Sequence, residues 1–373
     1  MDAAKRFLQE EDSGRWRSRL HVFGLDLRDI ALLEHFCEFV AKFYASIHIV
    51  VNNACQTVRR PPAYYAALVE DEMMKWDSMG ADMQALLQPY RLFLAAMDAL
   101  HAQMQTSSAS AEGPPVSAAE VIVEEVQRSS SSLSSAASAS EAASASASES
   151  LLPSMLPLPS VLKASCVPNS AQASQAVVIA GDDVLNPLLF PKGATDVNGQ
   201  QVDLRRENSW MLRLHQVSTD EMAEVLTINT MAPAVINARL KACMERNPKA
   251  WKFIVNVSAM EGKFYRYKSK NHPHTNMAKA ALNMMTRTSA QDYVTSFIYM
   301  TAVDTGWIND EKPVELAVQH ERMHNFQTPI DEVDAASRVL DPIISPLLQR
   351  QQGVAGVTPP WGVFLKDYQK CEW

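Results

Sequence analysis

Two histidines and a glutamate in the C-terminal part of the chain have the spacing of a zinc site. His320-Glu321-Arg322-Met323-His324 matches the pattern H-E-x-x-H, which on a helix places both histidines on one face and leaves the glutamate as a base. No third ligand stands at a convincing distance in the sequence, and Glu332 is expected to cap the following helix. We favour a solvent-facing amphipathic helix and keep a zinc hydrolase acting through His320, Glu321 and His324 as a remote alternative.

A basic run and a histidine pair precede another segment of chemical interest. The basic residues could attract an anionic substrate or a cofactor phosphate, although solvated loop charges are the more frequent case; they are Lys263, Arg266, Lys268 and Lys270. His272-Pro273-His274 follows, and we interpret it as a turn before a helix rather than as a ligand set.

Short strands and the helices between them must position these residues. Arg19 to Leu25 alternates like a strand, and Ile47 to Val51 is a β-branched run typical of a strand buried on both faces. Further strands are predicted at Phe253–Val257, Phe297–Val303 and Gly362–Leu365, and helices at Leu32–Phe43, from a capping box at Ser218 to about Met244, and at Thr275–Tyr293. Strands that alternate with helices predict a doubly wound parallel sheet.

A serine- and alanine-rich tract interrupts this pattern. It lacks the large apolar side chains that would offset the entropy of ordering the backbone. The expected parts of the chain are an N-terminal core part over residues 1–70, a helical insert over 71–105, a low-complexity disordered linker over 106–176, an irregular insert over 177–204 and a C-terminal core part over 205–373.

Six motifs at the ends of the predicted elements resemble those of the short-chain dehydrogenase/reductase family, in the family's order. They are Asp26-Leu27, Asn52-Asn53-Ala54-Cys55, Asn229 within Thr-Ile-Asn-Thr, the strand Ile254–Ala259 with Ser258, Lys279 within Met-Ala-Lys-Ala-Ala-Leu, and Val303-Asp304-Thr305-Gly306-Trp307. Their order over residues 1–56 and 205–373 carries the resemblance. It implies an α/β fold with a Rossmann-like doubly wound parallel sheet that lacks the first β-α-β segment, is split by the disordered insert, and binds ligands beyond the carboxyl ends of its strands.

The resemblance also implies an activity, namely hydride transfer between NAD or NADP and a small-molecule carbonyl or alcohol substrate. The expected catalytic residues are Asn229 to order a relay water, Ser258 or Thr275 to orient the substrate oxygen, and Lys279 to hold the cofactor ribose and tune the proton donor. Cofactor contacts are expected at Asp26, Leu27, Asn53, Ala54, Lys279, Thr305 and Gly306. Homo-oligomers are common in the family and are left open here.

Three departures from the family pattern put this activity in question. No Gly-x-x-x-Gly-x-Gly turn is present to bind a pyrophosphate, so either the chain is a fragment or ordinary dinucleotide binding has been lost. Thr275 stands where the family has a tyrosine, and an aliphatic hydroxyl is a much weaker acid than a phenol. Tyr265 and Tyr267 on the preceding loop could substitute for that tyrosine, although we favour ordinary loop aromatics. The third departure is that Ser258-Ala259 stands where the family has a pair of serines. The alternative is a catalytically inactive pseudo-oxidoreductase that acts as a scaffold or binding protein.

Composition excludes several other classes of function. The formal net charge of -8 argues against nucleic acid as a partner, because phosphate binding needs a basic face. No apolar run reaches the roughly 18 residues that a membrane span requires. The five cysteines are scattered without CxxC spacing, which is typical of reduced thiols, so a cytoplasmic location is expected.

Overall fold

The computed structural model describes residues 1–109, 175–309 except 180, 183, 185, 197, 198, 265 and 266, and then 311–324 and 328–373. Most of the predicted linker falls outside these residues. The described residues form two compact units. Unit 1 comprises Met1–Leu25, Asp29–Phe43 and residues 74–109, and unit 2 comprises Asp26–Arg28, Tyr44–Met73 and the described residues from 175 onward. The five-part division expected from composition stays a prediction.

Unit 1 is helical. It contains α1 (Asp2–Gln9), α2 (Ile30–Phe43) and α4 (Ala81–Ala109). The apolar residues that predicted a helix over 32–43 face the core of this unit, where Leu32 and Phe39 of α2 pack on Phe93 and Met97 of α4. None of the described helices of the protein is both long and apolar enough to cross a membrane.

The strand expected at Arg19–Leu25 does not form, and this prediction was wrong. Arg17–Arg19 is a 3₁₀ turn, and the extended backbone after it pairs with no strand among the residues that the structure describes. The N–H of Val22 donates instead to the carbonyl of Leu86 on α4. Phe23 and Leu25 pack against the apolar cluster of α2 and α4, so the alternating pattern is satisfied by helices rather than by a sheet.

Unit 2 contains the sheet. Its strands are β1 (Ile49–Asn52), β2 (Lys252–Ser258), β3 (Ile298–Asp304), β4 (Phe364–Lys366) and β5 (Gln369–Cys371). They lie in the order β1-β2-β3-β4-β5. The first four are parallel, as the alternation of strands and helices predicted, and β5 returns antiparallel to β4. Asp367 and Tyr368 make that return with φ of 48° and 64°, a hairpin turn whose residues do not have the usual Asn-Gly signature.

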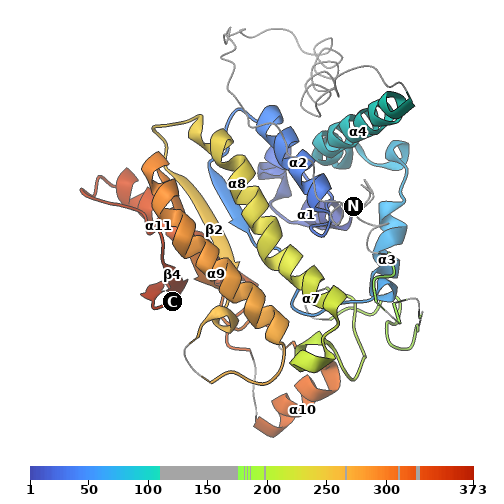
Figure 1. Ribbon diagram of the computed structural model, residues 1–373. Coiled ribbons are helices and arrows are strands. Elements are labelled where there is room, and N and C mark those ends of the chain that lie inside the picture. Colours follow the sequence, from blue (N-terminus) through green and yellow to red (C-terminus); the bar gives the residue numbers. More distant parts are fainter. Residues whose placement is uncertain are drawn as a thin grey trace. The chain divides into compact units, whose positions relative to one another are not determined.

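Helices cover both faces of the sheet (Figure 1). Phe253, Val255 and Val257 of β2 pack on Val339 and Ile343 of α11 (Glu332–Gln351). The alternate residues of β2 face α8 (Ala232–Glu245) and α9 (Pro273–Tyr293). The other helices of unit 2 are α3 (Pro62–Glu72), α7 (Thr219–Leu226), a π-helical turn (Thr227–Met231) and α10 (Val314–His324).

Strand β1 is not buried on both faces as its sequence predicted. Ile49 and Val51 are 47% and 36% exposed, whereas Val50 and Asn52 are buried. Among the strands of the described chain β1 pairs only with β2, so it lies at an edge of the sheet. A β-branched run identifies a strand but does not report whether a neighbour covers it.

A buried asparagine cluster joins the sheet to its helices. Asn52 and Asn256 face each other in register, and Asn52 Nδ2 donates to Asn256 Oδ1 at 2.8 Å. Asn237 on α8 donates to the same oxygen at 3.2 Å, and Asn256 Nδ2 donates to Thr286 Oγ on α9 at 2.9 Å. Asn256 and its partners Asn52, Asn237 and Thr286 are buried, so water cannot replace these hydrogen bonds. The Asn256 amide is the partner that the three side chains share.

Asn256→Ala should lower the free energy of unfolding by about 3 kcal/mol, because Asn52, Asn237 and Thr286 each lose a buried hydrogen-bond partner, and Asn52 and Asn237 keep only their bond to each other. Urea unfolding of the purified chain measures the effect. Asn247→Ala is the control, since the Asn247 amide contacts His48 at an exposed position and its loss should change stability by about 0.5 kcal/mol or less. Equal effects of the two substitutions would contradict a structural role for the cluster.

Candidate active-site cleft

The carboxyl ends of β2 and β3 open into a cleft of about 800 Å³. Six of the predicted catalytic and cofactor-binding residues line it, namely Asn53, Ser258, Thr275, Lys279, Thr305 and Gly306. The N-terminal turn of α9 and the segments that follow β1, β2 and β3 form the walls. Ligands of doubly wound sheets bind at this position, outside the carboxyl ends of the strands.

Helix α9 presents Thr275 and Lys279 to the cleft. The two residues are four apart, so they share one helix face. Lys279 is 6% exposed, and its Nζ donates to the carbonyl of Val257 on β2 at 2.9 Å. Thr275 is 2% exposed, and its hydroxyl has no hydrogen-bond partner within the described part of the protein. The hydroxyl oxygen is closed to solvent, so a ligand oxygen reaches it only with a shift of the cleft wall, and would then satisfy a buried group that otherwise costs about 1–3 kcal/mol.

Ser258 lies at the end of β2 on the face that carries α9. Its hydroxyl donates to Asn283 Oδ1 at 2.6 Å, and Asn283 Nδ2 donates to the carbonyl of Gly262 at 3.3 Å. The hydroxyl hydrogen of Ser258 is therefore committed to α9, although the residue lies at the wall of the cleft. The next residue, Ala259, also lines the cleft and has no hydroxyl.

Asn229 lies outside the cleft lining, in the π-helical turn after α7. Its Oδ1 accepts from the N–H of Gln56 at 2.7 Å, and its Nδ2 donates to the carbonyl of Gln56 at 2.9 Å. The side-chain amide thus holds the segment after β1 in the way that a neighbouring strand would. Both ends of this amide are therefore bonded to the backbone of Gln56. The role of Asn229 in ordering a relay water stays a prediction.

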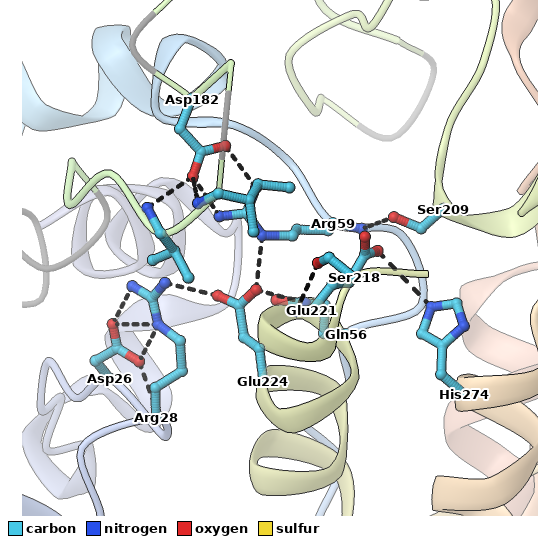
Figure 2. Close-up of polar contacts among 12 residues, drawn as sticks. Asp26, Arg28, Gln56, Arg59, Asp182, Ser209, Ser218, Glu221, Glu224 and His274 are labelled. Atoms are coloured by element: carbon cyan, nitrogen blue, oxygen red, sulfur yellow. Dashed lines mark hydrogen bonds and ion pairs between the residues drawn. The ribbon is translucent and has the colours of Figure 1, made fainter. Parts of the chain in front are cut away.

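The remaining predicted cofactor residues also lie outside the cleft lining. Ala54 is exposed beside the cleft residue Asn53, and Leu27 is half-buried in a turn. Asp26 accepts two hydrogen bonds from Arg28 Nε and a third from its Nη2, at 2.6–3.1 Å. Arg28 also binds Glu224 Oε1 on α7 at 2.7 Å, so the carboxylate of Asp26 begins a chain of ion pairs (Figure 2).

Arg59 continues this chain of ion pairs from Glu224, and no sequence motif predicted its role. Its guanidinium binds Glu224 Oε2 at 2.7 Å and both oxygens of Asp182 at 2.6 Å, with 7% of the side chain exposed (Figure 2). Burial alone would raise the pKa of Asp182, but the bonds from Arg59 and from the N–H groups of Val178 and Ile179 outweigh it and lower that pKa to about 2. Asp182 therefore stays ionised at neutral pH.

The ion-pair chain fixes one wall of the cleft. Cys55 and Thr57 line the cleft, while Gln56 and Arg59 of the same segment are held by Asn229 and by the carboxylates. The N–H of Arg59 also donates to Ser209 Oγ at 3.0 Å. The partners of Arg59 lie 123 and 165 residues away in the sequence, so no local pattern could have revealed them.

The turn predicted at His272-Pro273-His274 is confirmed. His272 is the N-cap of α9 and Pro273 is its first residue. The ring of His274 is completely buried, and neither of its nitrogens has a hydrogen-bond partner among the described residues. Glu221 Oε1 is 3.7 Å from His274 Nε2 (Figure 2). Burial, with a smaller contribution from His272, lowers the pKa of His274 to about 4.

The segment with the H-E-x-x-H pattern is helical, since α10 spans it. The side chains of His320, Glu321 and His324 lie outside the described residues, so their zinc-binding role stays a prediction. No group of three His, Cys, Asp or Glu side chains that could hold a metal occurs within the described set. Tyr267 lies at the cleft wall but is 94% exposed, and Tyr265 lies outside the described residues.

The cleft contains groups that could hold part of a dinucleotide. Lys279 offers its ammonium, Thr275 its unpartnered hydroxyl, and Gly306 a turn with φ of +86° where a Cβ would meet Ile330 at 2.6 Å. These groups suit a nicotinamide and its ribose. No glycine-rich turn onto a helix follows any strand in the part of the chain that the structure describes, so a cradle for the pyrophosphate is not among these residues.

Comparisons with known proteins gave partial matches. No family model matches the chain. It is 32% identical over 151 residues to the uncharacterized protein R665 of Acanthamoeba polyphaga mimivirus, over 39% of this chain and 32% of that protein. This chain therefore spans about a third of the length of that relative.

Similar solved structures are NADPH-bound carbonyl reductase from chicken fatty liver and the carbonyl reductase Sniffer of D. melanogaster. The first has 21% identity and a TM-score of 0.30, over 46% of this chain and 62% of that one. The second has 16% identity and a TM-score of 0.33, over 43% and 61%. A putative short-chain dehydrogenase/reductase from Burkholderia multivorans with bound NADP has 18% identity and a TM-score of 0.31, over 44% and 61%. The chain spans less than two thirds of each.

Arg59→Met should destabilise the protein by about 3–5 kcal/mol, because it leaves the buried carboxylate of Asp182 without its cation and that of Glu224 with Arg28 alone. Arg206→Met is the matched control: its ion pair with Glu315 is 3.6 Å long with side chains 84% and 68% exposed, so stability should not change measurably. Urea unfolding of both variants checks this. A loss for Arg59→Met no larger than for the control would contradict the role given to the ion-pair chain.

His274 should make the protein less stable as the pH falls from 6.5 toward 4. In that window the unfolded chain binds a proton on His274 while the folded chain does not, so acid favours unfolding. Between pH 7 and pH 5 this accounts for about 2 kcal/mol of the free energy of unfolding. His274→Phe, which buries a ring of similar size, should show a pH dependence smaller by that amount in urea unfolding. An unchanged pH dependence would rule out the neutral buried imidazole.

Proposed function

We propose that the cleft binds a small-molecule carbonyl or alcohol and serves its oxidoreduction with a nicotinamide cofactor, NAD or NADP, in a divergent chain of the short-chain dehydrogenase/reductase type. The observation that carries this proposal is the buried, unpartnered hydroxyl of Thr275 one helical turn from the ammonium of Lys279. A hydroxyl and a cation together suit an oxygen that alternates between a carbonyl and an alkoxide.

Each residue of the cleft has a part that follows from its position. Thr275 hydrogen-bonds the substrate oxygen and so orients it. Lys279, which the carbonyl of Val257 holds against β2, stabilises negative charge on that oxygen and offers further N–H donors to a ribose. Ser258 positions α9 through Asn283, to which its hydroxyl hydrogen is donated. A bound nicotinamide would supply or accept the hydride.

A second candidate function is ligand binding without turnover. Thr275 is too weak an acid to replace a phenol, and the hydrogen of Ser258 is already donated to Asn283. Such a chain would act as a scaffold or binding protein that keeps the cleft and has lost its chemistry.

Titration of the purified chain with NADPH and with NADH, followed by cofactor fluorescence, tests the proposal. At least one of them should bind, and Lys279→Met should weaken that binding roughly 10- to 100-fold, equivalent to about 1.4–2.8 kcal/mol. Lys249→Met, at an exposed position outside the cleft, should leave binding unchanged.

The outcomes separate the two functions. Binding accompanied by reduction of a carbonyl panel supports the oxidoreductase, and binding without reduction supports the binding protein. Absence of binding to both cofactors, or equal affinity of wild type and Lys279→Met, would refute the site as a nicotinamide site.

A further inference from the structure

His272 lines the cleft in a fixed orientation. It lies at the N-cap of α9, three residues before Thr275, and its ring stacks on the indole of Trp210, which also lines the cleft. The ring centroids are 3.7 Å apart and the planes are inclined by 9°. An aromatic stack of this kind removes the rotational freedom that an imidazole on a surface loop would otherwise have.

The hydrogen bond of the imidazole defines its tautomer. His272 Nδ1 is 3.1 Å from the carbonyl oxygen of Trp210. A carbonyl can only accept, so Nδ1 must carry the proton, and in the neutral ring Nε2 then has the free lone pair. No group of the described residues hydrogen-bonds Nε2, and the nitrogen is not sealed in the interior.

The backbone of His272 adopts a conformation that costs energy for a residue with a side chain. Its φ is 43°, in the left-handed region. The N–H of His272 donates to Leu212 at 2.8 Å, and its carbonyl accepts from Asn276 at 3.2 Å, so the surroundings hold the residue there. The side chain does not cap α9, whereas Ser218 and Asp331 cap their helices. Strain held in place without a capping role is typical of a functional position.

We propose that His272 is the acid–base residue of this cleft, a role that rests on the proposed function. In the oxidation direction Nε2 takes the hydroxyl proton of the alcohol. The O–H bond breaks, a second bond forms between that oxygen and the carbinol carbon, and the hydrogen on that carbon leaves as hydride to the oxidised nicotinamide cofactor. The carbonyl product, the reduced cofactor and an imidazolium result, and the imidazolium returns its proton to water.

The surroundings of His272 keep the imidazole neutral at pH 7. Burial lowers its pKa, and Lys268 contributes in the same direction, while the bond to Trp210 and the charge of Glu261 act against them. The titratable groups of its own helix that lie nearest in sequence are His274, which is itself neutral, and Lys279, which also lines the cleft. A base that is neutral at working pH can accept a proton in the transition state.

The predicted catalytic residues of the cleft and its tyrosine are less suited to this step. Lys279 donates to Val257, Ser258 donates to Asn283, and Thr275 is an aliphatic alcohol. Tyr267 is 94% exposed and so is not held toward the substrate oxygen. His272 therefore provides the acid–base group that the substitution of Thr275 for a phenol removes.

The test compares His272→Asn with wild type in the oxidation of a panel of secondary alcohols by NAD⁺ and NADP⁺. Asparagine tolerates the left-handed conformation and caps helices well, so the fold should persist and the melting temperature should not fall. Turnover should drop by about 100-fold or more. In the wild type, kcat/KM should decrease as the pH falls through the pKa of His272, which burial lowers. This acidic limb of the pH profile should be absent from the variant. His215→Asn, at an exposed position, is the control.

Two further readouts distinguish a catalytic from a structural role. Glycine adopts the left-handed conformation of residue 272 without strain, and His272→Gly leaves the space of the imidazole empty. Imidazole added to the solution should therefore restore part of the turnover. In ¹⁵N spectra of the histidine-labelled full chain, the His272 ring should be the neutral Nδ1–H tautomer at pH 7, assigned by its loss in His272→Asn.

Two results would overturn the proposal, and both differ from a failure of the proposed function. An active wild type whose His272→Asn variant keeps most of its turnover refutes the role of His272 alone. A His272 ring that is the Nε2–H tautomer, or already charged at pH 7, refutes it even where no alcohol is oxidised. A wild type that binds neither cofactor refutes the proposed function instead.

Discussion

Helix α9 approaches the carboxyl end of β2 so closely that Gly262 has no room for a side chain, because a Cβ there would lie 2.6 Å from the backbone of Lys279. Lys279 bonds the carbonyl of Val257, and Asn283 bonds Ser258 and Gly262. These contacts set the depth of Thr275 and Lys279 in the cleft. The same contacts also position the first turn of α9, which His272 precedes as the N-cap.

The opposite wall of the cleft depends on charges rather than on close packing. Arg59 is buried between Glu224 and Asp182, and the segment that contains it also supplies Cys55 and Thr57 to the cleft. A buried guanidinium is tolerated only with its carboxylates present, so this wall forms only when segments distant in the sequence meet. The buried asparagine cluster likewise joins residues distant in the sequence, here through neutral amides of β1, β2 and α8.

Regular elements could be predicted where the sequence pattern and the packing agree. The strand with Val255 and the helix with Lys279 are buried by neighbours on the expected faces, and both predictions are confirmed. The segment at Val22 alternates like a strand but meets α4, and β1 is β-branched but lies at an edge, because a local pattern does not identify its neighbour.

The candidate site was predictable only in part for the same reason. Thr275, Lys279, Ser258 and Gly306 lie at element ends, and topology brings such ends together. Asn229 lies within the π-helical turn and Asp26 in a loop, and their side chains bond Gln56 and Arg28 instead of facing the cleft. The stack of Trp210 on His272 joins positions 62 residues apart, and no spacing rule indicates it.

The proposed nicotinamide site is the cleft at the N-terminus of α9. Mapping amide shifts in ¹H–¹⁵N spectra of the full chain during titration with NADPH tests it most directly. The amides of Thr275, Lys279 and Gly306 should shift together and saturate with one affinity. Shifts confined to residues away from the cleft, or no shift at saturating NADPH and NADH, would contradict the account.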